Sequence, residues 1–142
     1  MILVDLEPGD PRFESEALPV LRELRPHLSA LSATEIYDEG YNQGLRFTAA
    51  FLDGRCVGVA GWHIVATMVA SRKLYIDDLV TTEECRGGGV GRFLLAGLLE
   101  RARDAGCVVI DLDSGNQRTD AHRFYVREGF ETTSVHFVRL VD

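Results

Sequence analysis

A cluster of glycines at Gly87, Gly88, Gly89 and Gly91 is the part of this chain best suited to bind a ligand. The cluster follows a stretch typical of a β-strand and precedes a stretch typical of an amphipathic helix. Glycine has no Cβ, so the backbone can turn sharply and bring its N–H groups close to a ligand. The start of a helix adds free N–H donors and a partial positive charge. The combination predicts a binding site for an anion, in particular for a phosphate group.

Two common phosphate-binding motifs do not fit this cluster. The dinucleotide fingerprint requires glycines at its first, third and sixth positions, and the sixth residue counted from Gly87 is Arg92. The loop of nucleoside triphosphatases ends in Gly-Lys-Ser or Gly-Lys-Thr, a triplet that the chain lacks. The motif that remains is Arg-x-x-Gly-x-Gly, at Arg86, Gly89 and Gly91. The alternative interpretation is a glycine-rich turn that only caps a helix.

This motif resembles the pyrophosphate loop of the GNAT superfamily, the acetyl-CoA-dependent N-acetyltransferases. The resemblance is close over residues 73–130 and loose over the rest of the chain. It implies that the loop binds the pyrophosphate of acetyl-CoA, which would serve as the co-substrate. The loop residues expected to bind it are Arg86, Gly87, Gly88, Gly89, Val90, Gly91 and Arg92.

The residues before the loop resemble the signature strand of the same family. The resemblance implies that the backbone of Leu79, Val80 and Thr81 pairs with the pantetheine arm of the cofactor. It also implies a bulge that splays this strand from the next one, with the thioester in the gap. One N–H group of these residues would then face the thioester carbonyl. Such a donor stabilises the developing oxyanion, typically by about 3 kcal/mol.

Asp77 and Asp78 are the candidates for a general base. An amine is mostly protonated at neutral pH and must lose a proton before it attacks, and a carboxylate can accept that proton directly or through water. By resemblance, Asp77 occupies a position that often carries an acidic residue. Adjacent strand residues point to opposite faces, so at most one of the two should face the catalytic cleft unless a bulge intervenes. Either carboxylate could instead cap a turn or anchor a loop.

Residues 121–130 resemble the second signature of the family, Ala-x-x-Leu-Tyr-x-x-x-Gly-Phe. Tyr125 falls on the tyrosine that family members use to protonate the departing thiolate, and a phenol of pKa about 10 holds a proton at neutral pH. The alternative is a tyrosine packed between helix and sheet. The family often has an asparagine three residues before Ala121, where this chain has Arg118. The guanidinium of Arg118 would suit a phosphate of CoA instead.

Composition and charge exclude several classes of protein. The 142 residues suit one domain, expected over residues 1–142. The net charge of −7 disfavours nucleic-acid and anionic-membrane partners and is compatible with an amine substrate. No stretch approaches the ~20 apolar residues of a membrane span, and residues 1–6 are typical of a strand rather than of a signal peptide. The histidines and the three cysteines show no metal-ligand spacing, so no metal is expected, and a reducing compartment, the cytoplasm, fits.

The apolar pattern and the turn signals predict the element order β-α-α-β-β-β-α-β-α-β. Strands are expected at residues 1–6, 45–52, 56–67, 73–82, 108–112 and 130–141, and helices at residues 14–25, 33–43, 89–105 and 121–128. The early hairpins are antiparallel and the unit at residues 74–112 is a parallel crossover, so the sheet is mixed. We expect Thr34 to cap its helix and residues 108–112 to be buried on both faces. The order matches the acyl-CoA N-acyltransferase fold of the family, an α/β (α+β) fold in which helices flank a central, mostly antiparallel sheet with a splayed pair of parallel strands.

The resemblance implies an N-acetyltransferase in which an amine attacks acetyl-CoA directly within a ternary complex. The acceptor could be a small-molecule amine or a protein amine, and a homodimer would fit the family. Acceptor recognition is expected in the first two helices and near Trp62 or His63. Three alternatives remain: an acyltransferase for another acyl-CoA, a non-catalytic acetyl-CoA-binding or regulatory module, and a structural domain without a CoA site. The candidates in the first two helices are His27, Tyr37, Glu39 and Tyr41.

Overall fold

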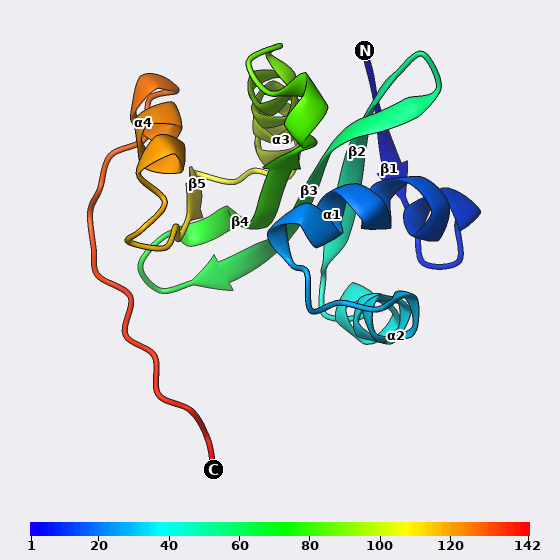
Figure 1. The fold of residues 1–142 in the computed structure, drawn as a ribbon. Helices are drawn as coiled ribbons and strands as arrows, with labels where there is room; N and C mark the ends of the chain where they lie inside the picture. Colours follow the sequence, from blue (N-terminus) through cyan, green and yellow to red (C-terminus); the bar gives the residue numbers. More distant parts are fainter.

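Five strands form one mixed sheet in the computed structural model, which describes residues 1–142 (Figure 1). The strands lie in the order β1-β2-β3-β4-β5. The pairs β1–β2, β2–β3 and β3–β4 are antiparallel and the pair β4–β5 is parallel, which confirms the predicted mixed sheet. Their bounds are β1 (Ile2–Leu6), β2 (Arg46–Leu52), β3 (Arg55–Thr67), β4 (Ser71–Thr81) and β5 (Val109–Leu112).

Helices cover both faces of this sheet (Figure 1). One face carries a π-helical turn (Phe13–Ala17), α1 (Leu18–Leu24) and α2 (Ala30–Tyr41). The other face carries α3 (Val90–Asp104), with α4 (Thr119–Arg127) beside it and a 3₁₀ turn (Glu83–Cys85) before it. Each face has its own apolar cluster, so the sheet is buried from both sides. None of the helices combines the length and the apolar character that a membrane span requires.

Local turn chemistry accounts for several of the boundaries. Asp53 and Gly54 both have positive φ, at 51° and 78°, as expected for the tight two-residue turn that joins β2 to β3. Helix α2 begins earlier than predicted, because Ser29 caps it through a reciprocal pair of hydrogen bonds with Ser32. Thr34 was the predicted cap, and this prediction is wrong: its hydroxyl donates to the carbonyl of Ala30 inside the helix.

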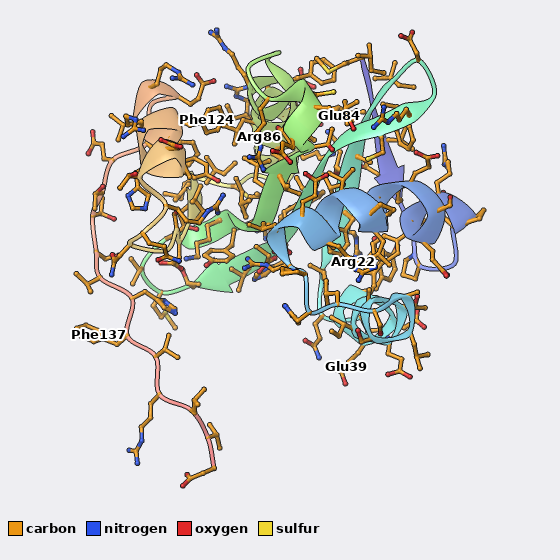
Figure 2. The ribbon with its side chains drawn as sticks, viewed as in Figure 1. Arg22, Glu39, Glu84, Arg86, Phe124 and Phe137 are labelled. Atoms are coloured by element: carbon orange, nitrogen blue, oxygen red, sulfur yellow. The ribbon has the colours of Figure 1, made fainter.

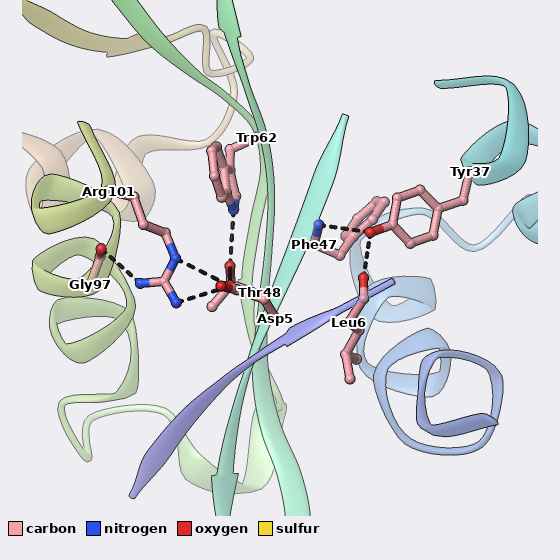
Figure 3. A network of polar contacts seen from close by, with 8 residues as sticks. All are labelled: Asp5, Leu6, Tyr37, Phe47, Thr48, Trp62, Gly97 and Arg101. Carbon is pink, nitrogen blue, oxygen red and sulfur yellow. Dashed lines mark hydrogen bonds and ion pairs between the residues drawn. The ribbon is translucent and has the colours of Figure 1, made fainter. Parts of the chain in front are cut away.

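A network of polar contacts joins α3 to the sheet, and Thr48 is at its centre (Figure 3). The Thr48 hydroxyl donates to Asp5 Oδ1 at 2.6 Å and accepts from Trp62 Nε1 at 2.9 Å. The guanidinium of Arg101, on α3, donates to the same Asp5 oxygen at 2.9 and 3.1 Å. On the other face, Tyr37 of α2 donates to the carbonyl of Leu6 and accepts from the N–H of Phe47. The two helical layers are therefore fixed to β1 and β2 by polar contacts as well as by packing.

Thr48→Val is expected to destabilise the fold by about 1–3 kcal/mol, the usual cost of leaving a buried polar group without its partner. Thr48 is fully buried, and valine has nearly the same shape but accepts no hydrogen bond from the indole of Trp62. Urea unfolding monitored by circular dichroism measures the change. Thr48→Ser keeps the hydroxyl and is the control, expected to lose less. Equal losses in both variants would contradict a role for the hydrogen bonds.

Strand β5 lies at the edge of the sheet, contrary to the prediction that residues 108–112 are buried on both faces. It pairs with β4 alone, and Val109 is 40% exposed. The continuous apolar run indicated a central strand, but no further strand forms after β5 to pair with its other edge.

The predicted final strand at residues 130–141 does not form. After α4 ends at Arg127, Gly129 turns the chain with a φ of 95°, and residues 131–142 run away from the body of the protein as an extended segment (Figure 1). We call residues 131–142 the C-terminal arm. No backbone hydrogen bond involves the arm, and a β-strand exists only where a neighbouring strand supplies those bonds.

Candidate active site

The glycine loop presents a row of free backbone donors at the start of α3. The N–H groups of five residues have no acceptor within the protein: Gly87, Gly89, Val90, Gly91 and Arg92. Gly87 and Gly89 have φ of 84° and 83°, and a Cβ at either position would meet open space. The turn therefore exposes its donors to solvent at the positive end of a helix, which is the arrangement that binds anions.

The packing beneath the loop fixes its position on the sheet. A Cβ on Gly58, in β3, would stand 2.6 Å from a methyl of Val90 and 2.9 Å from a methyl of Leu94. The absence of a side chain at Gly58 thus allows the first turn of α3 to approach the sheet closely. On the other side, a Cβ on Gly91 would stand 3.1 Å from the ring of Phe124, which points from α4 toward α3 in Figure 2.

Three arginines of the predicted cofactor site have exposed side chains. Arg86 is exposed and forms no ion pair within the chain. Arg92 pairs with Glu128 at 3.5 Å while remaining largely exposed. Arg118 occupies the N-cap position of α4 and is exposed. All three guanidinium groups are therefore accessible to an anion.

Strand β4 separates from β5 just before the loop. The last pair of residues in parallel register is Ile76 with Leu112, whereas β4 continues to Thr81. Over its final residues β4 pairs with β3 alone, so its other edge is unpaired. The predicted pantetheine-binding residues lie on this stretch, namely Leu79, Val80 and Thr81.

At the point where β4 separates from β5, the pairing of β4 with β3 contains a β-bulge. Gly61 pairs with Asp78, and the next residue, Trp62, pairs with Ile76, so Asp77 is an extra residue in β4. Because of the bulge, Asp77 and Asp78 both line the same cavity rather than facing opposite sides of the sheet. The bulge therefore allows both carboxylates to reach one cleft.

The cavity that they line lies between the sheet and the first two helices and has a volume of about 260 Å³. Its wall is mostly apolar, and its polar groups are Arg25, His27, Tyr37 and the two aspartates. Burial raises the pKa of Tyr37 to about 12, so its phenol stays protonated at neutral pH. The apolar lining residues are Phe13, Leu21, Leu28, Ala33, Ile36, Leu45 and Phe47.

The two aspartates have different partners. Asp77 Oδ2 lies 2.7 Å from His63 Nδ1, on the neighbouring strand, and its side chain is 30% exposed. Burial raises the pKa of Asp77 above its ordinary value, and the hydrogen bond from His63 opposes this effect only in part. Asp78 Oδ1 accepts from Arg25 Nε at 2.7 Å, and Arg25 also donates to the carbonyl of Asp77 at 3.3 Å. Asp78 is therefore held in an ion pair with Arg25, whereas the pKa of Asp77 is raised by burial.

Tyr125 lies on α4, on the other side of β4 from this cavity, and does not line it. Its ring packs edge-on against Phe124 and Phe130, at centroid distances of 5.3 and 5.6 Å. Its hydroxyl has no hydrogen-bond partner within the chain, and burial raises its pKa. The phenol is thus protonated at neutral pH and free to donate to a ligand.

The structure brings together some candidates and separates others. The loop, the unpaired end of β4 and α4 meet on one side of the sheet, and the two aspartates face the other side at the bulge. His27 and Tyr37 line the cavity, Glu39 projects into solvent, and Trp62 belongs to the core under α3. No sequence pattern pointed to Arg25, whose contact with Asp78 spans 53 residues.

The comparisons with known proteins agree with this geometry. The model of the acetyltransferase (GNAT) family matches residues 12–130. The chain is 32% identical over 125 residues to a Bacillus subtilis protein named as the uncharacterized N-acetyltransferase YhdJ, covering 87% of this chain and 88% of that protein. It is 32% identical over 130 residues to a glucosamine 6-phosphate N-acetyltransferase of Trypanosoma brucei brucei, covering 88% and 85%.

A solved structure shares the fold as well. Aminoglycoside N-acetyltransferase AAC(6')-Iy, in complex with CoA, superposes with a TM-score of 0.86 over 98% of this chain and 93% of that chain, at 19% sequence identity. With the family model matching most of its length and two curated relatives at 32% identity, the chain belongs to the GNAT acetyltransferase family.

Proposed function

We propose that this protein transfers the acetyl group of acetyl-CoA to an amine acceptor, and that residues 1–142 act as one catalytic domain. The observation that carries the proposal is the row of free N–H donors at residues 87–92, next to the unpaired end of β4. The free N–H donors suit a diphosphate, and the unpaired edge of β4 suits an extended chain that contains amide groups. Acetyl-CoA carries both groups in one molecule, and the solved structure that shares the fold is described as a complex with CoA.

In this proposal the cofactor lies across the α3 side of the sheet. The pyrophosphate accepts hydrogen bonds from the loop between Arg86 and Arg92, and Arg118 supplies a further positive charge for a phosphate group. The pantetheine chain lies beside β4 like an added strand and pairs with the backbone of Leu79, Val80 and Thr81. The thioester then lies in the gap between β4 and β5, where an N–H group near Val80 faces its carbonyl oxygen.

The amine acceptor enters from the opposite face through the cavity of α1 and α2. The carboxylates of Asp77 and Asp78 attract the ammonium form, and Asp77 accepts the proton that the amine must lose. The nitrogen lone pair forms the new C–N bond, and the carbonyl oxygen becomes an oxyanion held by the backbone donor. When the oxyanion collapses, the C–S bond breaks and Tyr125 donates its proton to the CoA thiolate. The nitrogen of the new amide loses its second proton to solvent, and solvent returns a proton to Tyr125. Holding both substrates in one complex supplies much of the acceleration.

A small-molecule amine suits the cavity better than a bulky acceptor does. The cavity of about 260 Å³ lies just below the range of pockets that hold drug-sized ligands. The relatives support this class, since one is named for glucosamine 6-phosphate and another for aminoglycosides. A protein amine would have to insert a single side chain or terminus into the cavity.

The proposed function is tested by a thiol-release assay with a panel of small amines and with acetyl-, propionyl- and succinyl-CoA. CoA release that depends on an amine, and that is fastest with acetyl-CoA, is the expected result. Release that is faster with another thioester would identify an acyltransferase for that acyl-CoA. Binding of acetyl-CoA without turnover of any amine or peptide would support a regulatory module, and no binding would support a structural domain.

A further inference from the structure

The cavity beside the two aspartates is apolar over most of its wall. Eight of its twelve lining residues are hydrophobic, if the ring of Tyr37 is included. The rings of Phe13, Tyr37 and Phe47 pack against one another at centroid distances of 4.8–5.3 Å and are buried. Ile36 lines the same cavity but is 54% exposed, so it belongs to the side that is open to solvent. The cavity therefore leads from solvent to a buried wall of aromatic rings.

Most of the polar groups in this wall already have partners. The Tyr37 hydroxyl both donates and accepts a hydrogen bond within the protein (Figure 3). Arg25, the only permanent cation of the wall, donates to Asp78 and to the carbonyl of Asp77. The groups that remain for an acceptor molecule are the two carboxylates and His27, which is on the exposed side. The cavity can thus hold one positive group and offers few hydrogen bonds to the rest of a ligand.

The aromatic wall begins directly beside the carboxylates. A Cβ placed on Gly61, in β3, would stand 2.8 Å from the ring of Phe47 and 3.0 Å from Oδ2 of Asp78. The ring and the carboxylate therefore meet at this glycine. A molecule whose ammonium group contacts the carboxylates must place its neighbouring atoms against apolar side chains.

These features disfavour two classes of amine. The hydroxyls of an amino sugar would be buried against apolar side chains without hydrogen-bond partners, which is unfavourable for each hydroxyl. The carboxylate of an amino acid is close to its amino group and would lie next to Asp77 and Asp78, where like charges repel and Arg25 is already paired. An amine on an apolar body avoids both penalties and gains from the burial of that body.

We propose that the acceptor is a primary amine on an apolar or aromatic body, an alkylamine or arylalkylamine without a second charged group. This inference rests on the proposed function and names the class of substrate that its acceptor cavity selects. The ammonium group contacts the two carboxylates before it loses its proton, and the body of the molecule lies against the rings of Phe13, Tyr37 and Phe47. The cavity of about 260 Å³ limits that body to fewer atoms than a drug-sized ligand has.

Matched pairs of amines test this class in the thiol-release assay with acetyl-CoA. In the series from ethylamine to hexylamine, kcat/KM should rise about fourfold for each methylene, the gain expected for burial of one CH₂ group. Phenethylamine should exceed phenylalanine, which adds a carboxylate, and glucosamine, which carries hydroxyls in place of the aromatic ring, by ~100-fold. Equal or faster turnover of phenylalanine or glucosamine would overturn the inference and leave the proposed function intact.

Ile36→Ser tests the apolar wall itself. Because Ile36 lines the cavity but is more than half exposed, the variant should fold normally. It should raise KM for phenethylamine by about tenfold and KM for ethylamine by less, since the shorter amine buries less apolar surface. Leu31→Ser is the matched control, because Leu31 lies on the same helix, is 70% exposed and does not line the cavity. Equal changes of KM for phenethylamine in both variants would mean that this wall does not bind the acceptor.

Binding measured without turnover separates this inference from the proposed function. Phenethylamine titrated into the protein, with and without CoA, should shift the NMR signals of the methyl groups of Leu28, Ile36 and Leu45, which line the cavity. Such shifts without CoA release from any amine would show that the cavity holds apolar amines although the proposed function is wrong. No shifts and no turnover of phenethylamine would overturn the inference.

Discussion

Replacement of Tyr125 by phenylalanine is expected to lower kcat by about 10²–10⁴-fold while acetyl-CoA binding and stability remain unchanged. This range is typical for the loss of a general acid. The Tyr125 hydroxyl has no partner within the chain, so its removal breaks no hydrogen bond of the folded protein. The ring and its edge-on contacts with Phe124 and Phe130 are kept. The loss should therefore affect the chemical step alone.

The pH dependence makes this prediction more specific. An acid works only while it holds its proton, and burial raises the pKa of Tyr125 above its ordinary value near 10. The wild-type rate should therefore persist to high pH and fall only as pH rises through that raised pKa, and Tyr125→Phe should lack this decrease. Tyr41→Phe, which removes a phenol from α2, is the control. A Tyr125→Phe enzyme with full kcat across the pH range would exclude the acid role.

Replacement of Asp77 by asparagine is expected to lower kcat/KM by about 10²–10⁴-fold near neutral pH, as for the loss of a general base. A base works only when it is unprotonated, so the wild-type kcat/KM should rise with pH through the pKa of Asp77. Burial raises that pKa, so the rise should occur above the ordinary range of an aspartate. Asparagine is nearly isosteric and cannot accept the proton, so the rise should disappear in the variant.

Two further variants separate the roles of the neighbouring groups. The hydrogen bond from His63 lowers the pKa of Asp77, so its loss in His63→Ala should move the rise of kcat/KM to higher pH. Asp78→Asn removes the ion pair with Arg25 but leaves Asp77 in place, so it should raise KM and keep the rise of kcat/KM with pH. Because the charge of Asp78 raises the pKa of Asp77, the rise should move to lower pH. If the rise of kcat/KM with pH persisted in Asp77→Asn and disappeared in Asp78→Asn, Asp78 rather than Asp77 would be the general base.

The parts of the fold that depend on local chemistry could be predicted from the sequence. The Asp53-Gly54 turn and the glycine loop follow from the backbone freedom of glycine and from the tolerance of aspartate for positive φ. The start of α2 was placed too late because the Ser29 and Ser32 pair is a weaker signal than a serine followed by glutamate.

The parts that depend on distant partners could not be predicted. Residues 130–141 have the pattern of a strand, but a strand requires a neighbour, and the single chain supplies none. The two aspartates were correctly singled out, yet their different surroundings come from His63 on β3 and Arg25 after α1. Which carboxylate is neutralised depends on these long-range contacts and on the bulge at Asp77, and no local pattern encodes them.

Calorimetric titration of acetyl-CoA into the folded protein tests the central claim, that the loop at residues 86–92 binds this cofactor. Gly89→Glu places a carboxylate among the free N–H donors, whereas Gly9→Glu makes the same change at another open glycine of positive φ, far from the loop in sequence. Micromolar binding by the wild type and Gly9→Glu, abolished in Gly89→Glu, is the predicted result. No binding by folded wild-type protein, or equal binding by Gly89→Glu, would contradict it.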